Sequence, residues 1–357
     1  MPVLTRPAVL LAAASVAAGL IVAPSAAYAS PQSPAAGTTA SGAATASGSA
    51  DVTTTLSAAE MAAAMKQVAA ASTTAGAGGW RADQNYAVDA PDSIGSFSGT
   101  STSVVDPVKG LFTDTFTTAG YGSVTTFAAA GRGVYESVGD PEQVAALKMM
   151  KRTPVKYAFT ADTTLTLAAH VAENAQSPES VAAEFTDAAT RVTHADGTAD
   201  YTAVDQEGAF VTLSVGATGV LTGAHAELEG EDGATEVTLA YAYGPQSVTL
   251  PAASATISSA ALATGVAYLS MDTAVRTVAN SGAAAARKAA KGKKVKVSAL
   301  RTVVRKSVTA HNRSAAVAVK VSNVTGGVKV QATNPWTRKT TAYTVKASGT
   351  KVVVKKA

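Results

Sequence analysis

The strand with the clearest pattern in this chain lies at residues 235–251, TEVTLAYAYGPQSVTLP. Its apolar and polar side chains alternate with a period of two, which places every second residue on the same face of a β-strand. Gly244-Pro245 interrupts the strand, and Pro251 ends the run that follows. The apolar positions are Val237, Leu239, Tyr241 and Tyr243. We interpret this stretch as the closing strand of a first domain, because the composition of the chain changes shortly after it.

Earlier segments of similar character predict the other strands of that domain. They lie at residues 80–88, 94–105, 110–118 and 123–130, and Gly, Pro and Asp turns join them, so we expect an antiparallel sheet. The aromatic residues expected to point inward are Trp80, Tyr86, Phe97, Phe112, Phe116 and Phe127. Later strands at residues 155–159 and 210–215 add Tyr157, Phe159 and Leu213 to this apolar set.

A helix is expected immediately before these strands. Ser57 and Glu60 have the spacing of a capping box, in which each side chain accepts a hydrogen bond from the backbone of the other residue. Met61, Met65 and Val68 then recur at helical spacing and predict a buried face.

Shorter helices are predicted in the middle of the chain, at residues 140–150, 163–174 and 178–185. The first and third begin with Asp-Pro and Ser-Pro, which combine an N-cap residue with a proline at the first helical position. After them the strands resume, and Asp196-Gly197 is a dipeptide favoured in type I′ hairpin turns.

Beyond Pro251 the chain changes character. We expect a helix over residues 256–290 with an interruption at Ser281-Gly282, and a second helix over residues 299–307. Alternating valines then predict a small antiparallel sheet whose other face carries Lys320, Lys329, Lys346, Lys351 and Lys355. A basic run before the second helix adds Lys291, Lys293 and Lys294.

The charge is distributed unevenly along the chain. Residues 256–357 carry nineteen Lys and Arg and one acid, Asp272, whereas residues 3–255 carry twenty-four acids and, without Arg6, nine bases. Such asymmetry bears on partners rather than on the fold. A basic face is most often only solvated; the two sharper hypotheses are binding to an anionic cell-envelope polymer or membrane surface and docking onto the acidic domain of the same chain. The scarcity of aromatic residues among the lysines argues against a specific nucleic-acid site.

The beginning of the chain predicts export. Residues 1–29 have a basic residue, an apolar core and an Ala-Tyr-Ala site, which together are typical of a secretory signal peptide. Residues 30–55 are rich in Ser, Thr, Ala and Gly and predict a disordered tether. We therefore expect a secreted, extracellular or envelope protein with two domains, at residues 56–254 and 255–357. No cysteine is present, which excludes disulfides and thiolate metal sites.

No reaction is indicated by the residues that usually carry chemistry. The serine-hydrolase motif is absent, and the four histidines, His170, His194, His225 and His311, show no metal-ligand spacing. Glu227, Glu229, Glu231 and Asp232 offer a weak calcium site, but a solvated hairpin loop explains them better. The sequence predicts neither an enzyme nor a cofactor.

An N-terminal helix, a run of antiparallel strands, a helical interruption, further strands and the ending Tyr-Ala-Tyr-Gly-Pro-Gln-Ser-Val-Thr-Leu-Pro together resemble the LolA/LppX/LprG superfamily of exported lipid carriers, over Leu56 to Pro251. The resemblance implies an α+β fold in which a curled antiparallel sheet forms a half-barrel, covered by helices, around an apolar cavity for acyl chains. The lipobox cysteine of the related lipoproteins is absent. The long helix and small sheet of the C-terminal part are weakly similar to the head of type IV pilins and pseudopilins.

These observations favour a binding protein. The strands between Trp80 and Tyr243 are numerous enough to curl, and their inward side chains are few and often small, so the sheet either collapses onto its helices or keeps a cavity. With a cavity, the expected ligand is a lipid or glycolipid held by the apolar set above, while the basic domain holds an anionic surface. With a filled interior, the alternative is a structural or adhesive envelope protein.

Overall fold

The computed structural model describes residues 51–89, 95–204, 208–230 and 233–357. The expected signal peptide, nearly all of the tether, and Ile94, Glu231 and Asp232 lie outside the described residues. The chain is α+β and divides into two compact units. The first comprises the described residues up to Arg132 together with Thr163–Thr249, and the second comprises Gly133–Asp162 together with Leu250–Ala357. The second unit therefore includes a segment that we expected in the first domain.

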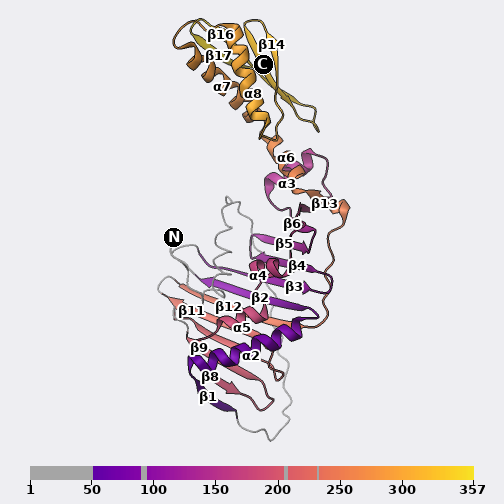
Figure 1. The fold of residues 1–357 in the computed structure, drawn as a ribbon, viewed down its shortest axis with the longest axis vertical. Helices are drawn as coiled ribbons and strands as arrows, with labels where there is room; N and C mark the ends of the chain where they lie inside the picture. The colour runs from indigo at the N-terminus through magenta and orange to yellow at the C-terminus, as the bar shows by residue number, and fades with distance from the viewer. Residues whose placement is uncertain (1–50, 90–94, 205–207, 231–232) are drawn as a thin grey trace. The chain divides into compact units, whose positions relative to one another are not determined.

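An open antiparallel sheet forms the first unit (Figure 1). Its strands are hydrogen-bonded in the order β1 (Val52–Leu56), β8 (Ala189–Thr193), β9 (Ala199–Val204), β10 (Phe210–Val215), β11 (Leu221–Gly230), β12 (Gly233–Tyr243), β2 (Trp80–Asp89), β3 (Phe97–Asp106), β4 (Leu111–Thr118) and β5 (Gly122–Ala129). Strands β2–β5 and β8–β12 are two meanders, each made of neighbours in sequence.

Strand β12 joins these two meanders and is the strand singled out above for its alternation. It pairs with β11 on one edge and with β2 on the other, in register from Ala234 opposite Asp89 to Tyr243 opposite Trp80. Val237, Leu239 and Tyr241 are buried, whereas the residues between them are exposed. The predicted strand and its buried face are confirmed; β12 is the last strand of the first unit along the chain and lies in the middle of the sheet.

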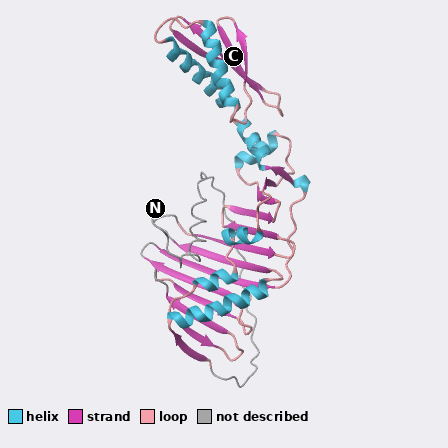
Figure 2. Ribbon diagram, in the orientation of Figure 1, coloured by secondary structure: helices cyan, strands magenta, loops and turns pink. Residues whose placement is uncertain are grey.

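Three helices of the first unit lie over one face of this sheet (Figure 2): α2 (Ala58–Gly76), α4 (Leu167–Asn174) and α5 (Pro178–Glu184). Helix α2 contacts β1, β11 and α5, and α4 contacts β4 and β5. The capping box is present, because the Ser57 N–H donates to Glu60 Oε2 at 2.9 Å and the Glu60 N–H donates to Ser57 Oγ at 3.4 Å. Met61, Met65 and Val68 are buried as predicted. We call the helix-covered face the inner face and the opposite one the outer face.

The turn after β8 differs from its prediction. A type I′ turn needs positive φ at both central residues, but at Asp196-Gly197 only Gly197 has positive φ, at 85°. The Asp196 carboxylate instead accepts hydrogen bonds from the Thr198 N–H at 2.9 Å and from the Thr198 hydroxyl at 2.7 Å. The side chain thus stabilises a longer turn in which glycine alone takes the left-handed conformation.

The second unit contains a small α+β region built from distant segments. Strand β6 (Gly133–Ser137) pairs antiparallel with β7 (Tyr157–Ala161), which pairs in parallel with β13 (Thr256–Ser258). Helix α3 (Pro141–Met149) packs on α6 (Ser259–Leu269), and Ala146, Leu147, Ile257 and Leu262 are buried between these elements. The parallel pair explains why residues 133–162 belong with the C-terminal part of the chain.

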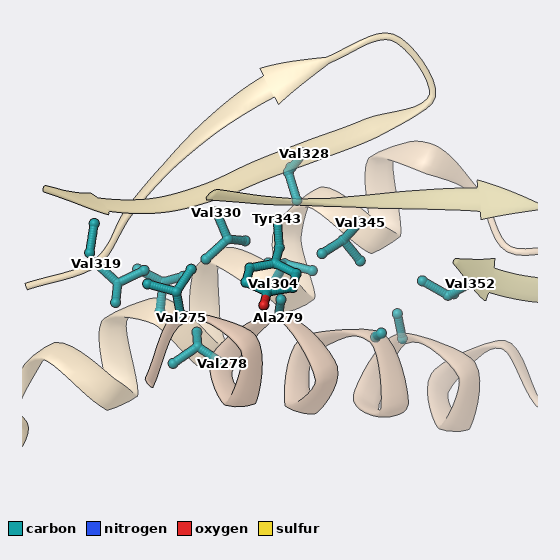
Figure 3. Packing of buried hydrophobic residues seen from close by; sticks show 14 of the residues in the cluster. Val275, Val278, Ala279, Val304, Val319, Val328, Val330, Tyr343, Val345 and Val352 are labelled. Carbon is teal, nitrogen blue, oxygen red and sulfur yellow. The ribbon is translucent and has the colours of Figure 1, made fainter. Parts of the chain in front are cut away.

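The rest of the second unit is a four-stranded antiparallel sheet covered by two helices (Figure 3). The helices are α7 (Met271–Ala290) and α8 (Val297–Asn312), and the strands are β14 (Lys320–Val324), β15 (Gly327–Thr333), β16 (Thr340–Ser348) and β17 (Lys351–Lys356). Val328, Val330 and Val345 of the sheet are fully buried against Val275 and Val304 of the helices. The predicted parity of valines and lysines in this sheet is therefore confirmed.

The long helix is interrupted at a different place from the one predicted. Helix α6 ends and α7 begins at Ser270, whereas α7 continues without a break through Ser281 and Gly282. At Gly282 an added Cβ would lie 3.0 Å from Val304 Cγ2 and 3.2 Å from Val304 Cα. Glycine here serves the close approach of α7 and α8. Among the described residues, no helix has the length and apolar character needed to cross a membrane.

Candidate functional site

The inner face of the first unit's sheet brings together most of the predicted apolar set. Strand alternation and register place nine of its twelve members there: Trp80, Tyr86, Phe97, Phe112, Phe116, Leu213, Leu239, Tyr241 and Tyr243. Phe112 and Leu213 are fully buried, whereas Phe97, Phe116 and Tyr243 are half-buried. The inner face is thus closely packed around Phe112 and Leu213 and more accessible around Phe97 and Phe116, towards the ends of the strands opposite Tyr243.

Three members of the predicted set lie elsewhere. Phe127 is opposite Thr113, and Thr113 alternates with the inward-pointing Phe112, so Phe127 is on the outer face. Tyr157 and Phe159 are on β7 in the second unit, where Phe159 packs against Tyr135 with ring centroids 4.5 Å apart. The position of Phe127 follows from the register between β4 and β5. The positions of Tyr157 and Phe159 follow from the division of the chain into two units.

An aromatic group marks the accessible end of the inner face. The Tyr86 ring is stacked on Phe116, with centroids 5.4 Å apart and 2° between the planes, and meets Phe97 edge-on at 6.1 Å. Next to Phe116, Val124 is on the same face and is 56% exposed. We call Tyr86, Phe97, Phe116 and Val124 the apolar end; two of its members are half-buried and one is exposed.

The Tyr86 side chain on β2 reaches across β3 to β4 because a glycine of β3 lies beneath the ring. Gly99 on β3 lies between Tyr86 on β2 and Thr118 on β4. A Cβ on Gly99 would lie 2.5 Å from Tyr86 Cζ. Without it, the tyrosine and threonine hydroxyls share a hydrogen bond of 2.9 Å across the glycine. This contact fixes the orientation of the Tyr86 ring.

Polar groups lie beside the apolar residues on the same face. Asp114 Oδ1 accepts hydrogen bonds from Ser101 Oγ at 2.9 Å and Ser103 Oγ at 2.7 Å. Burial raises the pKa of the Asp114 carboxyl, and the two serine hydroxyls oppose that shift. Burial also lowers the pKa of His170 on α4, whose ring meets Phe112 edge-on at 5.1 Å. The inner face thus offers one carboxyl, several hydroxyls and an imidazole that favours its neutral form.

A hollow of about 450 Å³ opens where β2, β3 and β12 end, next to the apolar end. Phe97 and Val88 contribute to its lining, but most of the lining residues, including Ala87, Ser98 and Glu236, are on the outer face. Asp89 also lines it, and the Ser96 hydroxyl donates to that carboxylate. The hollow is therefore polar on one side and reaches Phe97 on the other.

The lysine face of the second unit is the second candidate site. Lys320, Lys329, Lys346, Lys351 and Lys355 point away from α7 and α8; Lys329 is half-buried and the others are exposed. Lys329 and Lys355 are both opposite Thr344, so they lie two strands apart, roughly 10 Å. Among the described residues, none of the five is in a salt bridge; Asp272 is held by Lys356 at 2.7 Å and by the Tyr343 hydroxyl at 3.0 Å.

The other predicted basic residues lie at one end of this sheet. Lys291, Lys293 and Lys294 are exposed in the loop between α7 and α8. The Val295 N–H in that loop donates to the Gly349 carbonyl at 2.9 Å, in the turn that precedes Lys351. In contrast, Arg301 on α8 is used structurally, because its guanidinium donates to the carbonyls of Val324 and Gly327. The eight predicted lysines thus belong to one sheet face and its adjoining end.

His225 and Glu227 are considered separately in the sequence and are not grouped there with Glu236. His225, Glu227 and Glu236 bring one ligand atom each to within 4.8 Å of the others. His225 and Glu227 are two residues apart on β11, and Glu236 is opposite Glu227 on β12. The His-x-Glu spacing within a strand is the signal that was available, although the third member depends on the register of the hairpin.

We compared the chain with known protein families, curated proteins and solved structures. No family model matches the chain, and no curated protein matches it. One similar solved structure is an uncharacterized conserved protein from Thermus thermophilus, at 10% sequence identity and a TM-score of 0.27. The alignment covers 54% of this chain and 97% of that one. At this TM-score the likeness supports no conclusion about fold or function.

Proposed function

We propose that the first unit is an exported, non-enzymatic carrier of a lipid or another acyl-bearing ligand. In this proposal the antiparallel sheet is a half-barrel, and α2, α4 and α5 cover the ligand on its inner face. The main support for this proposal is the apolar end. There Val124 is 56% exposed on the inner face, beside the stacked rings of Tyr86 and Phe116. Water contact with these side chains is unfavourable unless an apolar partner replaces it.

Burial of an acyl chain supplies enough free energy for such a role. Each methylene removed from water contributes about 0.8 kcal/mol, so a chain of ~16 carbons gives roughly 12 kcal/mol before the cost of ordering it. The hydroxyls around Asp114 lie on the same face and suit a polar headgroup or ester. Aromatic residues that are only half-buried, such as Phe97 and Phe116, can change rotamer to admit the chain.

The experiment is native mass spectrometry of the full chain purified from its own host, with organic extraction of the bound material. We expect one acyl-bearing molecule per protein. Val124→Lys places an ammonium group in the apolar end and should reduce the bound fraction at least tenfold. The matched control is Val204→Lys, because Val204 is similarly exposed, at 51%, on the outer face of the same sheet. Ligand-free wild-type protein, or equal loss in both variants, would contradict the proposal.

For the second unit we propose attachment to an anionic envelope polymer or membrane surface through the lysine face. Its support is the row of ammonium groups without acidic partners among the described residues. Retention on anionic cell-wall material should fall as salt increases, because exposed charges are screened. Lys329→Gln combined with Lys355→Gln should weaken retention severalfold, whereas Lys156→Gln, which removes an exposed charge on another part of this unit, should not.

The competing proposal is a structural or adhesive envelope protein whose first unit is only a scaffold. The fully buried Phe112, Leu213 and Leu221 favour it, since the inner face is closely packed around them. It shares the lysine-face result but predicts no bound lipid, so the mass-spectrometric experiment distinguishes the two.

A further inference from the structure

We propose that His225, Glu227 and Glu236 form a binding site for a divalent transition-metal ion, with Zn²⁺ as the probe of choice. The site is on the outer face of the first unit's sheet and is independent of the inner-face carrier role. One nitrogen or oxygen from each residue lies within 4.8 Å of the other two. His225 Nε2 is 2.9 Å from Glu227 Oε1, and the ion would take the place of the proton that these atoms share.

The sheet holds these ligands in place. Residues two apart on a strand share a face, which puts His225 beside Glu227 on β11. Glu236 is directly opposite Glu227 on β12, and Thr238, opposite His225, has its hydroxyl 3.4 Å from Nδ1. All three ligands thus come from adjacent, hydrogen-bonded strands in the middle of the sheet, where the backbone is restrained.

A cation would relieve repulsion between the two glutamates of the group. Like charges directly opposite each other across an antiparallel pair destabilise it, and Glu227 and Glu236 are such a pair. The residues opposite them on the adjoining strands are uncharged: Phe210 and Ala87 flank the two glutamates, and Thr212 and Thr238 flank the histidine. Glu229, the next residue on this face of β11, adds a further carboxylate. No Lys or Arg occupies these flanking positions, so nothing there neutralises the two carboxylates.

The types of the three ligands indicate which metal ion would bind. One imidazole and two carboxylates suit Zn²⁺ or a neighbouring transition metal better than Ca²⁺, which prefers six or more oxygens. Three protein ligands leave coordination positions open. Glu236 also lines the hollow of about 450 Å³ described above, together with Ser98 and Asp89, so an ion held there would have its open coordination positions near this hollow.

Isothermal titration calorimetry of the full chain with ZnCl₂ at neutral pH tests the site. We expect one ion per chain with a micromolar Kd, and a loss of at least tenfold in affinity in His225→Ala and in Glu236→Gln. Glu229→Gln is the matched control, because Glu229 is exposed on the same strand and face but is not one of the three ligands; it should change the affinity by no more than about threefold. His194→Gln tests the half-buried histidine that lies between Asp51 and Asp200 elsewhere in the first unit, and it should leave the affinity unchanged.

Thermal stability gives a second readout that a general acidic patch would not reproduce. With chelator present, Glu236→Gln should melt above the wild type because the repulsion between opposite glutamates is removed. With ZnCl₂ the order should reverse, since an ion that binds only the folded state stabilises it. Equal stabilisation of both proteins by zinc, full affinity in His225→Ala, or equal weakening in Glu229→Gln would overturn the proposal, as would the absence of binding at about 1 mM ZnCl₂.

Discussion

The hydroxyls of Tyr86 and Thr118 share a hydrogen bond of 2.9 Å although the two residues are on strands separated by a third. The contact is possible because Gly99, between them, has no side chain. Both partners are buried, at 4% and 8% exposure, so neither can replace the bond with bulk water. One small residue therefore determines how the largest ring at the apolar end is held.

Replacement of Gly99 by alanine should destabilise the first unit by about 2 to 3 kcal/mol, since the new methyl group would overlap the Tyr86 ring and the Thr117 carbonyl. Tyr86→Phe should cost only about 1 kcal/mol, through the lost hydrogen bond. Urea denaturation measures both. The paired variant Gly99→Ala/Tyr86→Ala should recover part of the loss from steric overlap; an additive effect would show that the ring is not the obstacle.

His194 should make stability depend on pH. Its hydrogen bonds to Asp200 and Asp51, each 3.0 Å long, raise its pKa in the folded state. A raised folded pKa contributes stability that is fully present below the unfolded value of about 6.5 and is lost as pH rises through the folded pKa. His194→Gln should therefore melt below the wild type at pH 5.5, with the difference vanishing at pH 9.

Asp114 should show a related dependence through burial. Because its folded pKa is raised, the carboxyl favours folding when protonated, and that contribution is lost as pH rises through the folded pKa. Asp114→Asn keeps an oxygen to accept from Ser101 and Ser103. The variant should thus be more stable than the wild type at pH 8 and similar to it at pH 3.5, as measured by thermal melting. A less stable variant at pH 8 would show that the ionised carboxylate is favourable there.

Gly282→Ala should destabilise the second unit by about 1 to 3 kcal/mol. Alanine normally favours a helix over glycine by about 1 kcal/mol, but here its Cβ would press on Val304, a fully buried residue of α8. Ser281→Ala, on an exposed position of the same helix, is the control and should be neutral or slightly stabilising. Stabilisation by Gly282→Ala would mean that the two helices can move apart at little cost.

Local patterns predicted local structure well. The alternation around Val237 and Leu239 predicted β12 and its buried face, and the Ser57 to Glu60 spacing predicted the start of α2. Both depend on residues that are close together in the chain, where period and capping chemistry are decisive. The five lysines of the C-terminal sheet lie on the face opposite the buried valines for the same reason.

Features that depend on register or on distant contacts could not be predicted. Phe127 is on the outer face because the register of β5 with β4 places it opposite Thr113 and not opposite the inward-pointing Phe112. Residues 133–162 belong to the second unit because β7 pairs with β13, about 100 residues later. Likewise, Glu236 meets His225 and Glu227 only through the pairing of β11 with β12. A one-residue change in any of these registers would reverse the faces.

The pairing of β12 with β2 has a consequence for how the chain is made. Trp80 and Tyr243 are about 160 residues apart in sequence, yet they are neighbours in the finished sheet. Contacts between such distant segments slow folding. During synthesis, the β2 edge that pairs with β12 emerges long before that strand and stays unpaired, open to aggregation or to a chaperone, until β12 follows.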